Sequence, residues 1–154
     1  MTRLSEGDRA PIFTLSDQNA KKVGLKDYGG QRVVLYFYPA DDTPGCTKEA
    51  CQFNDQLSAF KKLDVAVVGI SPDGADKHQA FRSKYALKFT LLSDPSKKVM
   101  EKYGAFGEKM MYGKKVIGVI RSTFVIGPTG RVEHAFYNVR ADGHAAKILS
   151  GLTS

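Results

Sequence analysis

The sequence has few cysteines and no long hydrophobic run. Only two cysteines occur in 154 residues, too few for a small secreted scaffold held together by disulfides. No apolar run approaches the ~18 residues of a membrane-spanning helix, and glycine has no collagen-like period. The segment 1–13 is mixed polar and lacks the apolar core of a secretory signal. These absences predict a cytoplasmic protein, in which cysteines stay reduced unless they carry out redox chemistry.

The composition is typical of one folded domain. With 42% hydrophobic residues the chain is too apolar to be disordered, and it is long enough to fold without disulfides or a metal. The net charge is +7, but the basic residues form scattered pairs such as Lys61-Lys62 and Lys114-Lys115. A solvated basic surface explains this pattern better than one binding stripe does. We therefore expect a single domain over residues 1–154, with no nucleic-acid partner and no membrane partner.

Hydrophobic patterns predict strands that alternate with helices. The expected strands are 13–16 and 22–25, which form an N-terminal hairpin, then 33–38, 65–70, 89–92, 116–126 and 131–137. The expected helices are 43–62, 76–87, 96–103 and 141–152, and 107–113 is expected to be a flexible loop. The turn Pro128-Thr129-Gly130 makes the last two strands antiparallel, which disfavours an all-parallel, flavodoxin-like sheet. This order predicts an α/β, thioredoxin-like fold: a central mixed sheet flanked by helices, with the N-terminal hairpin as an extension.

The segment from Pro39 to Cys51 carries the chemistry. Thr43 is a favourable N-cap and Pro44 suits the first helical position, so Cys46 falls in the first turn of a helix. Free amides and the positive end of the helix dipole stabilise a thiolate there. Cys46 shares a face with an apolar stripe made of Ala50, Phe53, Leu57 and Phe60. We expect it at the bottom of a shallow pocket, after the first buried strand, where open α/β sheets bind ligands.

The residues alone leave other interpretations of Cys46 open. A cysteine on an apolar face can be a small buried hydrophobic residue. A zinc site would need three or four ligands, and the other candidates are scattered, namely His78, His134 and His144. A Cys-x-x-Cys motif is absent, which does not support a thioredoxin-type reductase.

Pro39, Thr43 and Cys46 reproduce the Pro-x-x-x-Thr-x-x-Cys signature of the peroxiredoxins, and the chain resembles this family. The spacing from Cys46 to Cys51 resembles its Q-type branch, also called bacterioferritin comigratory protein. Other stretches that resemble the same branch are 7–11, 109–115, 118–126 and 143–145. The resemblance therefore covers nearly the whole chain.

The resemblance implies a thiol peroxidase that uses no cofactor and no metal. Cys46 is then the peroxidatic cysteine, whose thiolate attacks hydrogen peroxide or an organic hydroperoxide and becomes a sulfenic acid. Thr43 is expected to hydrogen-bond the sulfur and the peroxide, and Pro39 to shield the pocket from water. Backbone amides near Gly45 and Cys46 are expected to polarise the second peroxide oxygen. Arg121 corresponds to the family's active-site arginine.

Arg121 also stands out by its position in the sequence. It is a charged residue within a predicted strand of isoleucine, valine and phenylalanine, where a charge is costly unless it is paired or functional. A guanidinium cannot deprotonate, so it can stabilise a thiolate and a developing alkoxide together. The residues alone leave open an arginine on the solvent face of an edge strand.

By the same resemblance, Cys51 is the resolving cysteine. It forms an intramolecular disulfide with Cys46, which a thioredoxin-like or glutaredoxin-like reductant reopens. This scheme permits a monomer, or at most a weak dimer. The alternative is a helix residue without a redox role, with resolution by an external thiol. Two cysteines this far apart on one helix cannot bond without distortion, so we expect oxidation to unwind the helix from about Thr43 to past Cys51.

Further expectations concern other residues. Glu49 is expected either to hold Arg121 or Lys48 or to be an exposed acid, and His144 is expected to be structural. The run 36–38 is expected in the core, and 110–112 at the border of the pocket or of a partner surface. Two rival functions remain: a redox-switched binding or chaperone-like module, and a thiol–disulfide oxidoreductase without peroxidase activity.

Overall fold

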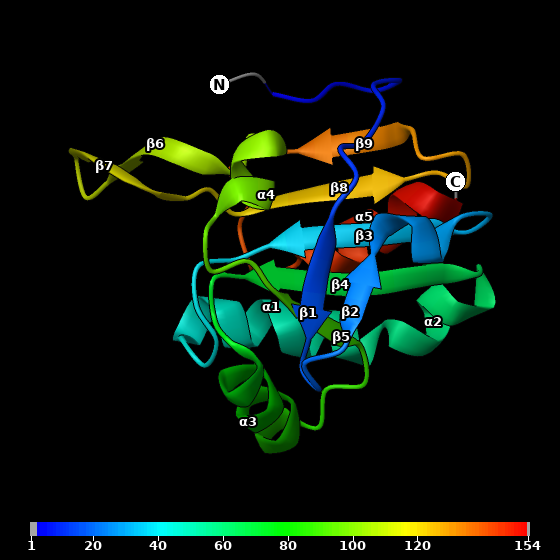
Figure 1. Ribbon diagram of the computed structural model, residues 1–154, viewed down its shortest axis with the longest axis horizontal. Helices are drawn as coiled ribbons and strands as arrows, with labels where there is room; N and C mark the ends of the chain where they lie inside the picture. Colours follow the sequence, from blue (N-terminus) through cyan, green and yellow to red (C-terminus); the bar gives the residue numbers. More distant parts are fainter. Residues whose placement is uncertain (1–2, 154) are drawn as a thin grey trace.

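A seven-stranded mixed sheet forms the centre of the computed structural model, which describes residues 3–153. Its strands are β1 (Thr14–Asp17), β2 (Lys22–Gly24), β3 (Arg32–Phe37), β4 (Val65–Ser71), β5 (Thr90–Ser93), β8 (Ser122–Ile126) and β9 (Val132–Phe136). They lie in the order β2-β1-β5-β4-β3-β8-β9 (Figure 1). The pairs β3–β4 and β4–β5 are parallel, and the other pairs are antiparallel. The predicted mixed sheet with an N-terminal hairpin is confirmed.

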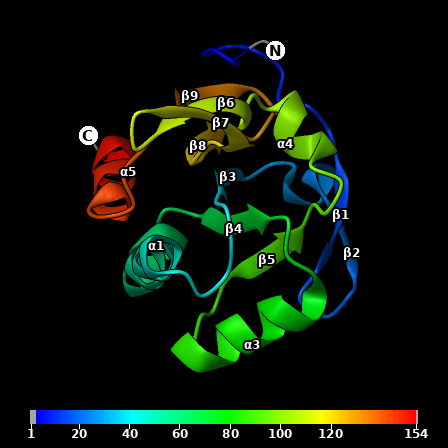
Figure 2. The same ribbon diagram turned by 90° about the vertical axis from the view of Figure 1, so that its left-hand side faces the viewer.

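Helices cover both faces of this sheet. They are α1 (Pro44–Asp55), α2 (Leu57–Lys62), α3 (Ala75–Tyr85), α4 (Lys98–Lys102) and α5 (His144–Thr153), with a 3₁₀ turn η1 (Leu25–Tyr28). Figure 2 shows α1 and α5 on one side of the sheet and α4 on the other. Successive side chains of a strand point to opposite faces. Accordingly Leu35 and Phe37 pack with the α4 side, whereas Val34 and Tyr36 pack with α1, α2, α3 and α5.

The ring of Tyr36 fixes how α1 sits on the sheet. It stacks on Phe53 of α1, with ring centroids 4.7 Å apart, and lies across Gly69 of β4. A Cβ atom at Gly69 would lie 2.9 Å from the Tyr36 ring, so this position needs glycine. The aromatic run of β3 is therefore core, as predicted, and it forms the surface on which the helix with Cys46 packs.

Two predictions for the segment 107–126 are wrong. The expected loop 107–113 is largely strand β6 (Phe106–Met111), which pairs with β7 (Lys114–Val119) in a separate two-stranded ribbon. Tyr112 and Gly113, with φ of 52° and 79°, form its turn. The expected strand 116–126 is two strands, β7 and β8, because the chain leaves the ribbon at residues 120–121 to enter the main sheet.

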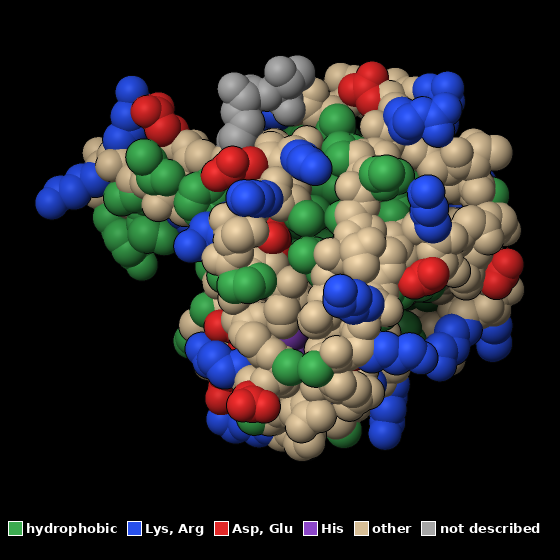
Figure 3. All heavy atoms as spheres, viewed as in Figure 1, with side chains coloured by type: hydrophobic (Ala, Val, Ile, Leu, Met, Phe, Trp, Pro, Cys, Tyr) green, Lys and Arg blue, Asp and Glu red, His purple; other side chains and the backbone are tan. Residues whose placement is uncertain are grey.

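The β6–β7 ribbon projects from the body of the molecule (Figure 1). Most of the large hydrophobic side chains exposed within residues 3–153 belong to it, namely Met110, Met111, Tyr112 and Ile117. Figure 3 shows hydrophobic side chains along the underside of this ribbon, whereas lysine and arginine side chains are spread over the visible face instead of forming a stripe. Within the described residues, no helix combines the length and hydropathy needed to cross a membrane.

The helix predicted over 43–62 is interrupted. Gln56, with φ of −95° and ψ of 3°, separates α1 from α2. The apolar stripe nevertheless stays buried along both helices, from Ala50 and Phe53 to Leu57 and Phe60. The break thus changes the direction of the chain without exposing the stripe.

Candidate active site

Cys46 lies in the first turn of α1, as the sequence predicts. Its side chain is only 1% exposed and belongs to the core cluster on the α1 side of the sheet. Thr43 occupies the N-cap position with extended backbone, and Pro44 is the first helical residue. This local pattern starts the helix at a point that brings the sulfur against the sheet.

The first turn of α1, which carries the Cys46 sulfur, has two backbone amides without helical hydrogen bonds. The amide of Thr47 donates to the carbonyl of Thr43 at 2.8 Å, so the amides of Gly45 and Cys46 precede the helical hydrogen bonds. The predicted N-cap position of Thr43 is confirmed, but its hydroxyl donates to the carbonyl of Ala40 at 3.0 Å and makes no side-chain cap bond to the helix. In this conformation its proton is also not directed at the sulfur, contrary to the expected hydrogen bond to Cys46.

Arg121 contacts Cys46 directly. Its Nη2 lies 3.3 Å from the Cys46 Sγ, and its Nη1 lies 2.5 Å from Glu49 Oε1. The predicted position in the middle of a strand is wrong. Arg121 lies in the break between β7 and β8, where its backbone carbonyl accepts a hydrogen bond from the amide of Val139. A Cβ at Gly45 would lie 3.3 Å from Nη2, so glycine leaves room for the guanidinium. The side chain is 17% exposed, so the charge acts in a partly desolvated site.

Glu49 is the fixed partner of this arginine. Its side chain is fully buried, and within residues 3–153 its Oε2 has no hydrogen-bond partner. Burial raises the pKa of the Glu49 carboxyl to about 7, although Arg121 opposes this change. Burial also disfavours the charge of Arg121, but Glu49 and then Cys46 outweigh it and raise the arginine's pKa. Of the expectations for Glu49, the contact with Arg121 is confirmed.

His144 packs behind the site as a neutral ring. Its Nε2 lies 2.8 Å from Thr123 Oγ1, and its ring meets Phe53 edge-on. Burial, and then the positive charges of Lys147 and Arg121, lower the pKa of His144 to about 4. These contacts fit the predicted structural role.

Pro39 and Cys51 complete the set of predicted residues. Pro39 is half-buried in the bend after β3, on the loop that leads to Cys46. Cys51 is on α1 with Cys46, half-buried, and both cysteines are free. Burial, and then the neighbouring Asp55, raise the pKa of the Cys51 thiol. The structure thus brings Cys46 and Arg121 into contact, with Pro39 and Thr43 on the adjoining loop, and leaves Cys51 unpaired.

Comparison with known proteins identifies the family. The model of the AhpC/TSA family matches residues 6–135. The chain belongs to this family. A protein of Mycobacterium tuberculosis that is provisionally named a peroxiredoxin is 54% identical over 152 residues, covering 99% of this chain and 97% of the relative.

Solved peroxiredoxin structures agree with this assignment. A cysteine-to-serine mutant of peroxiredoxin Q from Xylella fastidiosa is 36% identical, with a TM-score of 0.92 over 99% of this chain and 98% of that chain. The bacterioferritin comigratory protein of Xanthomonas campestris is 37% identical, with a TM-score of 0.86 over 92% and 90%. The resemblance to Q-type peroxiredoxins, the thioredoxin-like fold and the predicted enzyme class are confirmed.

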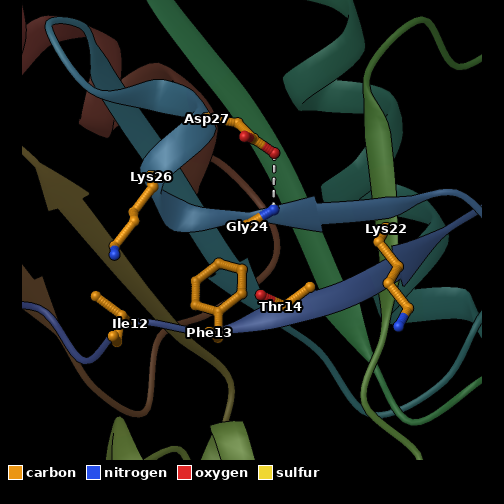
Figure 4. Close-up of a pocket in the computed structure, with 7 residues that line it drawn as sticks. All are labelled: Ile12, Phe13, Thr14, Lys22, Gly24, Lys26 and Asp27. Carbon is orange, nitrogen blue, oxygen red and sulfur yellow. Dashed lines mark hydrogen bonds between the residues drawn. The ribbon is translucent and has the colours of Figure 1, made fainter.

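A cavity elsewhere in this peroxiredoxin is lined by none of the site residues. It measures about 580 Å³ and lies at the N-terminal hairpin (Figure 4). Its lining residues are Ile12, Phe13, Thr14, Lys22, Gly24, Lys26 and Asp27. None of them is a cysteine, and Asp27 is held by the amide of Gly24 at 2.9 Å.

Sequence reasoning missed one polar cluster next to the site. Asp41, on the loop before α1, lies 2.6 Å from a ring nitrogen of His78 on α3, and both side chains are buried. Asp41 lies within the motif that carries Pro39 and Thr43, which was the available signal. Its partner is far away in sequence, so only the fold brings the two together.

Proposed function

We propose that the protein is a thiol peroxidase in which Cys46 is oxidised by peroxides and Cys51 resolves the product. One observation carries the proposal: the buried Sγ of Cys46 lies at the free N-terminal amides of α1, 3.3 Å from a guanidinium nitrogen of Arg121. Amides and a permanent cation stabilise both a thiolate and the negative charge that develops on the leaving oxygen of the peroxide. Disulfide exchange alone has no need of a cation that stabilises a leaving oxygen.

In the oxidation step the Cys46 thiolate attacks the terminal oxygen of the peroxide. A sulfur–oxygen bond forms, the oxygen–oxygen bond breaks, and the leaving alkoxide or hydroxide takes up a proton. Arg121 and the amides of Gly45 and Cys46 stabilise the charge on the leaving oxygen. The Thr43 hydroxyl donates to Ala40, so its lone pairs can accept a hydrogen bond from the peroxide. Pro39 limits the access of water.

In the resolving step the Cys51 sulfur attacks the Cys46 sulfenic acid, forming a disulfide and releasing water. Burial and the adjacent Asp55 raise the pKa of Cys51, which keeps it a thiol while α1 is folded. A thioredoxin-like or glutaredoxin-like dithiol then reduces the disulfide by exchange. The alternative is resolution by an external thiol, which would give a mixed disulfide of Cys46 instead of the Cys46–Cys51 bond.

The proposed substrates are hydrogen peroxide and organic hydroperoxides. The similar protein of Xanthomonas campestris is described by its alkyl peroxide reduction activity, which supports the organic class. We also propose that the enzyme acts in the cytoplasm as a monomer, without metal or cofactor.

A peroxide-consumption assay coupled to thioredoxin tests the proposal. The wild-type protein is expected to turn over peroxide, and Cys46→Ser is expected to lose turnover while circular dichroism shows an unchanged fold. Comparable turnover by Cys46→Ser would show that another group is the nucleophile. If the wild-type protein exchanged disulfides but consumed no peroxide, the thiol–disulfide oxidoreductase would be the correct function. A mass spectrum after one equivalent of peroxide identifies the partners of the disulfide.

A further inference from the structure

The loop between β3 and α1 is tied to α3 by two consecutive aspartates. Asp42 points outward and contacts Lys84 at 2.9 Å and Tyr85 at 2.7 Å, near the end of α3. Because these groups are exposed, the contacts contribute little to stability. Asp41 points inward and is 4% exposed, so its contacts have the stronger effect.

Asp41 forms hydrogen bonds to three different parts of the fold. The Tyr38 hydroxyl donates to Oδ1 at 2.5 Å, and Nδ1 of His78 lies 2.6 Å from Oδ2. The backbone amide of Asp41 donates to a carboxylate oxygen of Asp73 at 2.6 Å. Both oxygens and the amide are therefore used, and none of these partners belongs to α1.

The hydrogen bonds of His78 fix the proton count of this cluster. Its Nε2 lies 3.0 Å from the carbonyl oxygen of Leu92, which only accepts, so Nε2 carries a proton. The contact between Nδ1 and Asp41 Oδ2 holds one further proton between the two atoms. The pair is consequently neutral as a unit, and loss of either side chain leaves a buried polar group unpaired.

The clamped loop also supplies the first hydrogen bond of α1. Thr43 lies two residues after the anchored Asp41, and its carbonyl accepts a hydrogen bond from the amide of Thr47. Starting a helix is the unfavourable step of its formation, because several residues must be fixed for one hydrogen bond. A loop that is already in place lowers this cost each time α1 re-forms.

We propose that Asp41 and His78 are positioning residues for the peroxidase reaction. They hold the loop that carries Pro39 and Thr43 against α3 independently of α1. The loop then keeps its place while α1 unwinds to form the Cys46–Cys51 disulfide, and the pocket re-forms on it after reduction. This inference rests on the proposed function.

Matched variants at position 41 test the positioning role. Asp41→Asn keeps both side-chain hydrogen bonds without the shared proton, since its amide oxygen accepts from Tyr38 and its amide nitrogen donates to Nδ1 of a neutral His78. Asp41→Ala removes these two bonds and leaves only the bond from the backbone amide to Asp73. Both changes are made in a Cys51→Ser background, so that the rate of Cys46 oxidation by hydrogen peroxide is measured in a single turnover.

We expect Asp41→Ala to lower this rate about ten- to hundredfold, the effect of leaving a buried polar partner without its hydrogen bond. Asp41→Asn is expected to stay close to the parent. An Asp41→Ala rate within about twofold of the parent, at a temperature where both are folded, would overturn the proposal. A purely structural pair lowers the melting temperature without changing the rate per folded molecule. If the parent itself did not react, the proposed function would fail instead.

Amide exchange on the wild-type protein provides a test that needs no variant. The disulfide is formed with a thiol-specific oxidant, so the result does not depend on peroxidase activity. We expect the Asp41 amide, which donates to Asp73, to keep its protection while amides 47–51 lose theirs. Equal loss of protection in the loop and the helix would overturn the proposal.

Discussion

Oxidation of the two cysteines is expected to unwind the first turns of α1. Cys46 and Cys51 lie on this one helix, five positions apart. Regular helix geometry then separates their Cα atoms by about 8.6 Å and turns their side chains ~140° apart around the axis. A disulfide needs Cα atoms within roughly 7 Å and converging Cβ atoms. The bond therefore requires the helix to open between Thr43 and a point past Cys51.

The packing of the helix indicates how far the opening extends. Ala50 and Phe53 are fully buried, and Phe53 stacks on Tyr36. Removing a phenylalanine side chain from the core costs about 1.5–3 kcal/mol. We therefore expect amides 47–51 to lose protection completely and Phe53 to loosen, while helix ends open at lower cost than the core.

Amide exchange of the reduced and oxidised protein measures this change. The control is Cys51→Ser treated with the same oxidant, which cannot form the bond and is expected to keep the protection of α1. Equal protection of residues 46–53 in both forms, with the disulfide confirmed by mass spectrometry, would refute the geometric reasoning.

Four further predictions concern single side chains. Arg121→Ala is expected to slow Cys46 oxidation on the order of 10²–10³-fold and to lower the thiolate absorbance at neutral pH; unchanged absorbance would contradict its role. Cys51→Ser is expected to be oxidised once and then to accumulate sulfenic and sulfinic acid in mass spectra, whereas normal cycling with thioredoxin would identify an external thiol as the resolving group. The pKa of His144 is about 4 in the fold against an ordinary 6.5, so stability should be lost as the pH falls from 6.5 to 4, and His144→Gln should flatten this part of a urea-unfolding series. Glu49 acts in the opposite direction, because its pKa of about 7 exceeds the ordinary 4.5 and stability should fall as the pH rises between these values. A His144→Gln series that superimposes on that of the wild type would show that the histidine does not contribute.

Local signals in the sequence predicted the start of the site well. The Thr43-Pro44 pair marks the beginning of a helix in any context, and the apolar run of β3 marks a buried strand, so Cys46 could be placed from the chain alone. The break at Gln56 gave no such signal. Glutamine is a good helix former and the apolar stripe continues through it, so the interruption depends on how the two helices pack against the sheet.

The strand β6 and the contacts of the site also depend on packing that the local sequence does not indicate. In a two-stranded ribbon with both faces near solvent, burial does not impose an alternating pattern, so the sequence of β6 predicts a loop. The site depends on contacts between residues distant in sequence, such as Arg121 with Glu49 and Asp41 with His78. A charged residue in an apolar segment indicates that it has a partner, but only the fold identifies the partner.

The break at Gln56 also limits how much apolar surface the redox cycle releases. On its C-terminal side, Leu57 and Phe60 hold α2 on the sheet, and α2 has helical hydrogen bonds of its own. Opening of α1 can therefore end at Gln56 without spreading into α2. Under the proposed cycle, each turnover is then expected to expose part of one helix instead of the whole stripe, which would protect the oxidised protein from aggregation through its own core.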